Sequence, residues 1–178
     1  HLAAQATAAS EGVMSFLGPG PVSAFKMGLR MGGLLFPTPL DFQETSPGQF
    51  LRAALENIAY GVKANLGVLE EVTDRRIESL SIGGGMAASP VLATSLANVL
   101  GFPVKCSVTP QVSAMGAALV TAGSIEGSRG EGSWGPGGSF EAGQAVFRET
   151  EPESPSDVAQ QQECYQQWLE TYRRLDWE

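Results

Sequence analysis

The sequence is poor in the side chains on which many enzymes depend. Its 178 residues include one histidine, His1, and two cysteines, Cys106 and Cys164. Within this chain these counts exclude Ser-His-Asp and Cys-His catalysis and zinc sites built on imidazole. Cys106 lies in an apolar run and Cys164 in a polar tail, which predicts a reducing compartment rather than a disulfide scaffold.

Positive charge and long apolar runs are also scarce. The chain has 11 Lys and Arg against 19 Asp and Glu, for a net charge of −8, and no basic cluster exceeds two adjacent arginines. We therefore expect no binding to nucleic acid through its phosphates. No apolar run is long enough for a bilayer span, and the N-terminus lacks the pattern of a signal peptide. These absences predict a cytoplasmic protein that does not contact a membrane.

The composition is that of a globular protein. Hydrophobic residues make up 43% of the chain, and the mean hydropathy is −0.02. A chain of 178 residues suffices for one domain with a hydrophobic core. It begins with His1 rather than methionine, which is consistent with a piece of a longer protein.

The most informative stretch runs from Leu80 to Pro90. An apolar strand, Leu80–Ile82, is followed by three glycines at 83–85, and Ser89 then precedes Pro90. Serine is a good N-cap and proline suits the first helical position, so a helix is predicted to begin here. A strand that passes through glycines into a helix N-terminus is typical of nucleotide crevices in α/β proteins. A purely structural turn is the alternative.

The remaining periodicity predicts an α/β order of elements. We expect helices at 47–71, 90–100, 112–121 and 157–175, strands at 79–82 and 102–108, a short strand at 13–17, and a hairpin or kinked strand at 28–39. Residues 1–10 could also be helical. The strands at 79–82 and 102–108 should be parallel neighbours joined by a right-handed crossover. The helix at 47–71 should pack on this sheet, and those at 90–100 and 112–121 should cover it.

The long first helix has a capping box, formed by Ser46 and Gln49. One apolar face is predicted to enter the core; it consists of Leu51, Leu55, Ile58, Ala59, Val62, Leu66 and Leu69. Arg52 and Glu56 are one turn apart and are expected to form a surface ion pair without a catalytic role.

The composition changes near the C-terminus. Residues 123–138 are rich in glycine and predict a flexible loop, and residues 142–155 are acidic and irregular. We therefore divide the chain into a lobe at 1–145 and a tail at 146–178. The tail helix should dock through Val158, Cys164, Tyr165, Trp168, Leu169 and Tyr172.

Four motifs in order resemble one family. They are QFLRAALENIAY at 49–60, SIGGG at 81–85 with Ser89, LANVLGFPV at 96–104 and SAMGAA at 113–118. Together they are similar to the C-terminal domain of the FGGY carbohydrate kinases, the group of xylulose, gluconate and glycerol kinases. The resemblance covers about residues 48–122, and the match to the family's last helix is weak.

This resemblance implies a ribonuclease H-like fold, the α/β lobe of actin, sugar kinases and heat-shock chaperone ATPases, present in part as a mixed sheet flanked by helices. It implies nucleotide contacts from Gly83, Gly84, Gly85, Met86 and Ser89. It further implies ATP or ADP as ligand, Mg²⁺ as cofactor, and a sugar or polyol bound by a lobe that this chain lacks. No metal ligand is identified within the chain. Ala114, Gly116 and Ala117 are expected to serve tight helix packing.

The chain departs from the family at several points. The family's catalytic aspartate in a Gly-x-x-Asp context and its first phosphate loop have no counterpart here, and Asn98 occupies a position that is commonly aspartate. We therefore assign no catalytic residue and expect this chain to be inactive alone, as part of an ATP-dependent carbohydrate kinase.

Two other functions are considered. The first is a degenerate, non-catalytic kinase lobe that serves in assembly, because such a lobe would also lack the catalytic base. A Rossmann dinucleotide module fits the pattern Gly83-x-Gly85-x-x-Ala88, but residues 101–111 lack the acidic residue that its ribose needs. Neither the sugar nor the oligomeric state follows from the sequence, and a homo-oligomer stays open.

Overall fold

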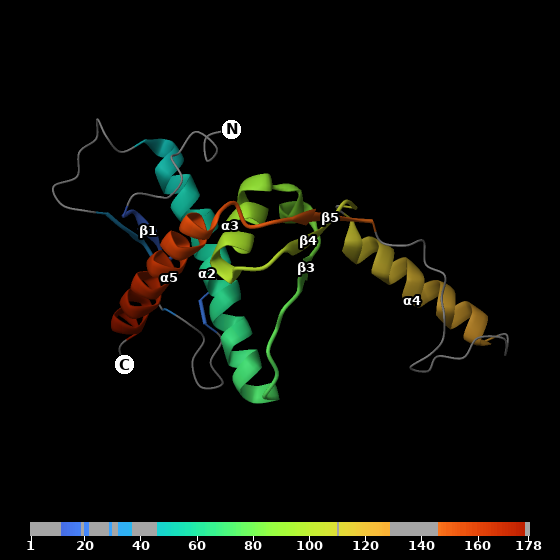
Figure 1. Cartoon of the computed structure of the whole chain (residues 1–178). Helices are drawn as coiled ribbons and strands as arrows, with labels where there is room; N and C mark the ends of the chain where they lie inside the picture. The colour runs from blue at the N-terminus through green and yellow to red at the C-terminus, as the bar shows by residue number, and fades with distance from the viewer. Residues whose placement is uncertain are drawn as a thin grey trace.

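The computed structural model describes residues 12–18, 20–21, 29, 32–36, 46–109, 111–128 and 146–176. The predicted helix within residues 1–10 lies outside these ranges. The described chain forms a three-stranded sheet, a separate two-stranded sheet and four α-helices (Figure 1).

The main sheet has the order β3-β4-β5. Its strands are β3 (Leu80–Ile82), β4 (Val104–Ser107) and β5 (Phe147–Thr150). β3 and β4 are parallel, as predicted, and pair from Leu80 with Val104 to Ile82 with Cys106. β5 is antiparallel to β4, so residues 142–155, which we expected to be irregular, contain the third strand. The sheet is mixed, as the predicted fold class requires.

The expectations for the N-terminal strands are confirmed in part. β1 (Met14–Ser15) is antiparallel to β2 (Leu34–Leu35), so the predicted strands at 13–17 and 28–39 pair with each other, although both are only two residues long. The backbone N–H of Phe16 also donates to the carbonyl of Gly33 at 2.8 Å.

Two helices begin and end close to their predicted boundaries. α2 (Pro47–Thr73) is two residues longer than expected, and the side-chain oxygen of Gln49 accepts the N–H of Ser46 at 2.6 Å, which closes one half of the capping box. α3 (Pro90–Leu100) begins after the N-cap Ser89 and ends at Gly101, whose φ of 79° is in the left-handed region. Both N-termini combine a serine cap with proline at the first helical position.

α2 does not pack directly on the sheet as we predicted. It packs mainly on α3, β1 and α5 (Pro155–Leu175), while α3 contacts β4 and β5. α3 therefore lies between α2 and the sheet. This position explains the burial of nearly every α3 side chain from Leu92 to Val99, including Leu96 and Ala97.

The buried face of α2 agrees with the predicted one only in part: Ala59 is buried, and Ile58 and Val62 pack against the core. Leu51 and Leu69 are 43% and 48% exposed, whereas the buried residues are Gly48, Gln49, Arg52, Ala53, Glu56, Asn57, Ala59, Tyr60, Gly61 and Ala64. The small residues among them allow α3 to approach closely. Two of the polar ones, Glu56 and Asn57, receive hydrogen bonds from Gln161 and Trp168 of α5, which no pattern of apolar residues could reveal.

α5 is the predicted tail helix and is part of the central core. Tyr165, Trp168 and Tyr172 are buried, and Val158, Cys164 and Leu169 are partly buried. The rings of the three aromatic residues form a cluster with Phe16 and Tyr60, in which Phe16 stacks on Trp168 with 5.9 Å between the ring centres. The division of the chain at residue 145 stays a prediction, but the described residues on either side share one sheet and one core.

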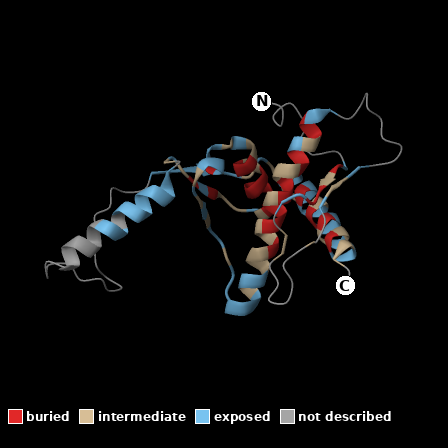
Figure 2. Cartoon of the chain, turned by 180° about the vertical axis from the view of Figure 1, so that it is seen from behind, coloured by how far each residue is buried: buried red, intermediate tan, exposed pale blue. Residues whose placement is uncertain are grey.

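α4 (Val112–Ser128) differs most from expectation. It continues through the first six residues of the predicted glycine-rich loop, of which residues 129–138 lie outside the described ranges. It does not cover the sheet: Figure 1 shows it extending away from the other elements, and its described side chains are exposed in Figure 2. The predicted tight packing at Ala114, Gly116 and Ala117 is therefore wrong within the described chain, where a Cβ on Gly116 would meet nothing within 4 Å.

Candidate nucleotide-binding site

The glycine turn, residues 83–89, lies where β3 ends and α3 begins. Gly84 has φ 94° and ψ −177°, a conformation that essentially only glycine adopts. Gly85–Ala88 then form a 3₁₀ turn, closed by a hydrogen bond from the N–H of Ala87 to the carbonyl of Gly84 at 3.1 Å. The sequence predicted the turn and the helix after it, but not this 3₁₀ segment.

Two residues fix the turn to the body of the protein. Ala87 is 2% exposed and anchors the middle of the turn in the interior. Ser89 caps α3, because its hydroxyl accepts the N–H of Leu92 at 3.4 Å. Ser89 thus has a demonstrated structural role, while its predicted role as a nucleotide contact stays a prediction.

The outer side of the turn is open. Gly83 and Gly85 are exposed, and no described atom lies within 4 Å of a Cβ built on Gly84 or Gly85. Met86 is 51% exposed, so a large apolar side chain stands beside this bare backbone. The predicted residues are neighbours in the sequence, and the surface that the glycines and Met86 present has room for a flat ligand.

The site lies at the carboxyl edge of the parallel pair. β4 ends on the same edge, where the hydroxyl of Ser107 accepts the N–H of Thr109 at 3.3 Å and donates to its carbonyl at 3.2 Å. α4 starts just beyond, and Val112 Cγ2 lies 3.0 Å from a Cβ built on Gly83. Ligands of open α/β sheets bind outside the carboxyl ends of their strands, so this edge is the expected position for one.

The electrostatics of the turn favour an uncharged group. No charged residue occurs between Glu78 and Lys105, and the first turn of α3 contains no acidic residue. The helix N-terminus contributes partial positive charge, but no lysine or arginine supplements it. Such a surface suits a base and a ribose better than a triphosphate. Among the described residues, no group of three or more His, Cys, Asp or Glu is placed to hold a metal ion.

Arg52 and Glu56 form a buried pair rather than the predicted surface pair. Their side chains are 11% and 2% exposed, and Arg52 Nε donates to Glu56 Oε1 at 3.2 Å. Gln161 Nε2 donates to the same oxygen at 3.2 Å, and the Tyr60 hydroxyl donates to Gln161 Oε1 at 3.2 Å. Burial, and next the negative charge of Glu56, raise the pKa of Tyr60 well above its usual range. The network joins α2 to α5 and serves packing, since it lies inside the core.

Asn98, where the resemblance led us to expect aspartate, makes two hydrogen bonds to one residue. Its side-chain NH₂ donates to Glu153 Oε2 at 2.9 Å, and its carbonyl oxygen accepts the N–H of Glu153 at 2.8 Å. An aspartate could accept the N–H but could not donate to the carboxylate. Asn98 therefore connects α3 to the segment between β5 and α5.

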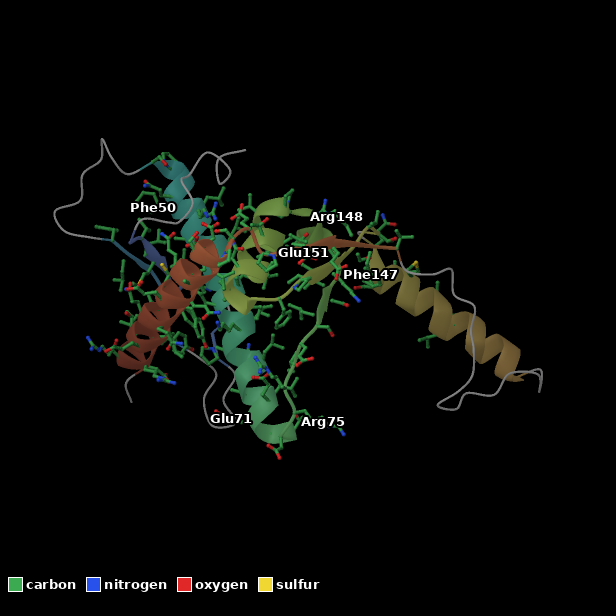
Figure 3. All side chains as sticks on the ribbon, in the orientation of Figure 1. Phe50, Glu71, Arg75, Phe147, Arg148 and Glu151 are labelled. Carbon is green, nitrogen blue, oxygen red and sulfur yellow. The ribbon has the colours of Figure 1, made fainter. Side chains whose placement is uncertain are left out.

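A cavity of about 490 Å³ lies beside the C-terminal half of α2 and the chain just before β3 and β4, and no residue of the glycine turn lines it. Figure 3 labels Glu71 and Arg75 at this end of α2. Lys63 lines the cavity, donates to the carbonyl of Val99 at 2.6 Å and lies 4.8 Å from the centre of the Tyr165 ring. Burial lowers the pKa of Lys63. The lysine already binds protein groups, and no sequence motif pointed to this cavity.

Two further observations concern the whole described chain. Cys106 and Cys164 are both free thiols. No helix in the described ranges is long and apolar enough to cross a membrane.

Comparison with known proteins gives a consistent result. The profile of the FGGY family of carbohydrate kinases, C-terminal domain, matches residues 3–125. Glycerol kinase 2 of Thermotoga maritima is 29% identical over 135 residues, which cover 75% of this chain and 26% of that protein. A putative sugar kinase of Bacillus subtilis, YoaC, is 36% identical over 100 residues, which cover 56% of this chain and 20% of that protein.

Solved structures are similar over nearly the whole chain. The xylulose kinase from Rhodospirillum rubrum has a TM-score of 0.65 and 25% identity, and the match covers 98% of this chain and 33% of that one. Glycerol kinase from Plasmodium falciparum, solved with ADP, has a TM-score of 0.69 at 14% identity, which supports the fold alone. These likenesses confirm the predicted ribonuclease H-like α/β fold. The chain spans about a quarter of the length of the curated relatives and a third of the length of the solved neighbours.

Proposed function

Because the chain belongs to the FGGY family of carbohydrate kinases, we propose that it is the nucleotide-side part of an enzyme that transfers the γ-phosphate of ATP to a sugar or polyol hydroxyl. The observation that carries the proposal is the glycine turn, with its bare backbone at Gly84 and Gly85 beside the exposed Met86. A turn of this kind can accept the flat face of an adenine. We accordingly propose Gly83, Gly84, Gly85, Met86 and Ser89 as its nucleotide contacts.

Each part of the turn has a distinct task in this proposal. The glycines let the base lie close to the backbone, and Met86 forms an apolar wall beside it. Ser89 holds the N-terminus of α3 in place next to the ribose. The absence of charge between Glu78 and Lys105 fits this assignment, because adenine and ribose are themselves uncharged.

The rest of the phosphotransfer chemistry is assigned to the part of the enzyme that this chain does not contain. Phosphoryl transfer needs a positioned triphosphate, a metal ion that neutralises it and a base for the acceptor hydroxyl. The sequence has no Gly-x-x-Asp and no phosphate loop. Mg²⁺ is proposed to bind through the phosphates and residues of that other part, because Mg²⁺ commonly has few protein ligands. A cytoplasmic location is proposed with the same function, and the sugar and the oligomeric state are left open.

Two measurements on the 178-residue chain test the proposal. A titration with ADP, followed by amide chemical shifts, is expected to give weak saturable binding with its largest shifts at residues 83–89. A coupled assay with glycerol, xylulose and gluconate is expected to show no sugar-dependent ATP consumption. Shifts confined to other segments would refute the site. Turnover that survives repurification would refute the division of labour between this chain and the rest of the enzyme.

The competing function is that of a degenerate lobe kept for assembly. The native reading frame distinguishes this function from that of a kinase. A kinase of this family needs a second lobe, on the order of 300 residues when judged by ordinary domain sizes. A frame that extends upstream by that length and contains a Gly-x-x-Asp supports the kinase. A frame without that aspartate supports the assembly role.

A further inference from the structure

The cavity beside the C-terminal half of α2 has a size that suits a small organic ligand. Its volume of about 490 Å³ falls within the range of roughly 300–1,000 Å³ that is typical of ligand pockets. Four parts of the chain meet there: α2, the segment 76–78 that leads into β3, the end of α3 with residues 101–102, and α5. The proposed function does not use this cavity, since no residue of the glycine turn lines it.

The walls of the cavity are partly apolar. The aromatic and aliphatic side chains among them are buried or half-buried, and they are Leu66, Ile77, Leu100, Phe102 and Tyr165. Gly67 also lines the cavity, and a Cβ built on it would meet nothing within 4 Å, so the space beside this part of α2 is open. Such walls can bury the apolar body of a ligand.

Lys63 supplies a positive charge inside the cavity. Its half-buried side chain donates to the carbonyl of Val99 at 2.6 Å and lies 4.8 Å from the centre of the Tyr165 ring. An ammonium group has three N–H donors, so two remain for a ligand. No carboxylate among the described residues forms an ion pair with Lys63. Burial lowers its pKa, and no charge of a described neighbour offsets that effect.

The other charges at the cavity do not neutralise Lys63. Arg76 and Glu78 are exposed and opposite in sign, so salt in the solvent screens both. Glu70 Oε1 accepts the N–H of Ile77 at 2.7 Å, so this carboxylate holds the segment before β3 rather than the lysine. The C-terminus of α3 carries the equivalent of roughly half a negative charge, which the full positive charge of an ammonium exceeds.

We propose that this cavity binds a small organic anion, with a carboxylate or phosphate head on Lys63 and an aromatic or branched apolar body against Leu66 and Phe102. The head supplies the counter-charge that Lys63 lacks within the described chain. The body displaces water from apolar walls, which favours binding whatever the charge of the ligand. A neutral or cationic ligand of the same shape gains only the second of these contributions. This site goes beyond the proposed function and does not depend on it.

Four compounds with one benzene ring each test the charge of the ligand on the 178-residue chain. Phenylacetate and phenyl phosphate carry the two anionic heads, phenylacetamide is the neutral match of phenylacetate, and benzylammonium is a cation. Binding is followed through amide chemical shifts. At least one anion should give saturable shifts at the lining residues, with a Kd on the order of 1 mM and at least about tenfold below that of phenylacetamide. The comparison of the two anions distinguishes a carboxylate ligand from a phosphate ligand.

Variants of the chain assign the binding to Lys63. Lys63→Met should weaken binding of the anions at least about tenfold and leave that of phenylacetamide unchanged, whereas Lys63→Arg should keep most of the preference. Lys105→Met, at an exposed lysine of β4 that does not line the cavity, is the matched control and should change nothing.

A second variant tests the cavity without altering its charge. Lys63→Met also removes the bond to Val99 and can lower the melting temperature, so a variant that keeps this bond is needed. Gly67→Leu places a side chain in the open space beside α2 and improves the helix propensity of that position. It should abolish binding of all four compounds without lowering the melting temperature.

Equal affinity for the anions and phenylacetamide, or tighter binding of benzylammonium, would overturn the proposal. So would the absence of saturable shifts, shifts confined to other residues, or binding that survives Gly67→Leu. If Lys63→Met does not fold, the comparison of the compounds and the Gly67→Leu variant decide. ADP binding at residues 83–89 is measured separately, and its outcome bears only on the proposed function.

Discussion

The glycine turn can be tested by separating its backbone strain from its contact with a ligand. Gly84 has φ 94°, so a side chain there is strained whatever the space around it. Gly85 has no such conformation, and a Cβ on it would meet nothing within 4 Å. Gly84→Val therefore combines strain with obstruction, whereas Gly85→Ala adds only a methyl group to the open face. Gly67→Ala, at another open position in the interior of α2, is the control.

The structure gives the expected size of each effect. A residue other than glycine in the conformation of Gly84 costs roughly 1–3 kcal/mol of folding stability. Gly85→Ala should leave stability nearly unchanged, and Gly67→Ala should raise it by about 0.5–1 kcal/mol, because glycine is a poor residue in a helix interior. If adenine lies against the turn, losing one well-packed face costs about 1–3 kcal/mol of binding, or roughly ten- to a hundredfold in Kd.

The assay measures the Kd for ADP and the free energy of unfolding in urea on the same preparation of each variant. We expect Gly85→Ala to weaken ADP binding without loss of stability, Gly84→Val to impair both, and Gly67→Ala to leave binding unchanged. When Gly84→Val is made in an assembled enzyme, its Michaelis constant for ATP should rise much more than its Michaelis constant for the sugar. An unchanged Kd in Gly85→Ala, together with a stability loss confined to Gly84→Val, would show that the turn is scaffold only.

Three further predictions concern the core. Glu56→Ala removes the carboxylate that pairs with the buried guanidinium of Arg52 and should lower the free energy of unfolding in urea by about 3–5 kcal/mol. Glu170→Ala, in the exposed pair with Arg174, is the control and should lower it by less than about 1 kcal/mol. Equal losses would contradict the burial argument. Asn98→Asp should lower the free energy of unfolding by about 1–3 kcal/mol, because it places a second carboxylate against Glu153. Adding Glu153→Gln should restore most of the lost stability. A single variant as stable as the original chain would refute this pairing. The pKa of Tyr60 is raised from 10.0, so the folded state keeps that proton longer than the unfolded state, and stability should fall as the pH rises above about 10 by up to about 1.4 kcal/mol per pH unit. Tyr60→Phe should flatten that slope in urea titrations at several pH values, and an unchanged slope would count against the assignment.

Local sequence signals determined much of this protein. Ser46 with Gln49, Ser89 with Pro90, and Gly101 define helix ends through short-range hydrogen bonds and backbone conformations, so the boundaries of α2 and α3 could be read directly. The triple glycine at 83–85 predicted a turn of unusual backbone conformation, and Gly84 has the positive φ that such a turn needs. The order of four motifs was sufficient to identify the family, because that order does not depend on packing.

Only the tertiary structure decided which faces are buried. Arg52 and Glu56 looked like a surface pair because charged residues at that spacing usually face water, and their burial depends on Gln161, more than a hundred residues away. β5 could not be predicted from its own polar sequence, since its pairing with β4 supplies the reason for its extended form. α4 was expected to cover the sheet because it is apolar. The structure shows instead that its described residues are exposed and lie apart from the sheet, which the apolar sequence of the helix could not reveal.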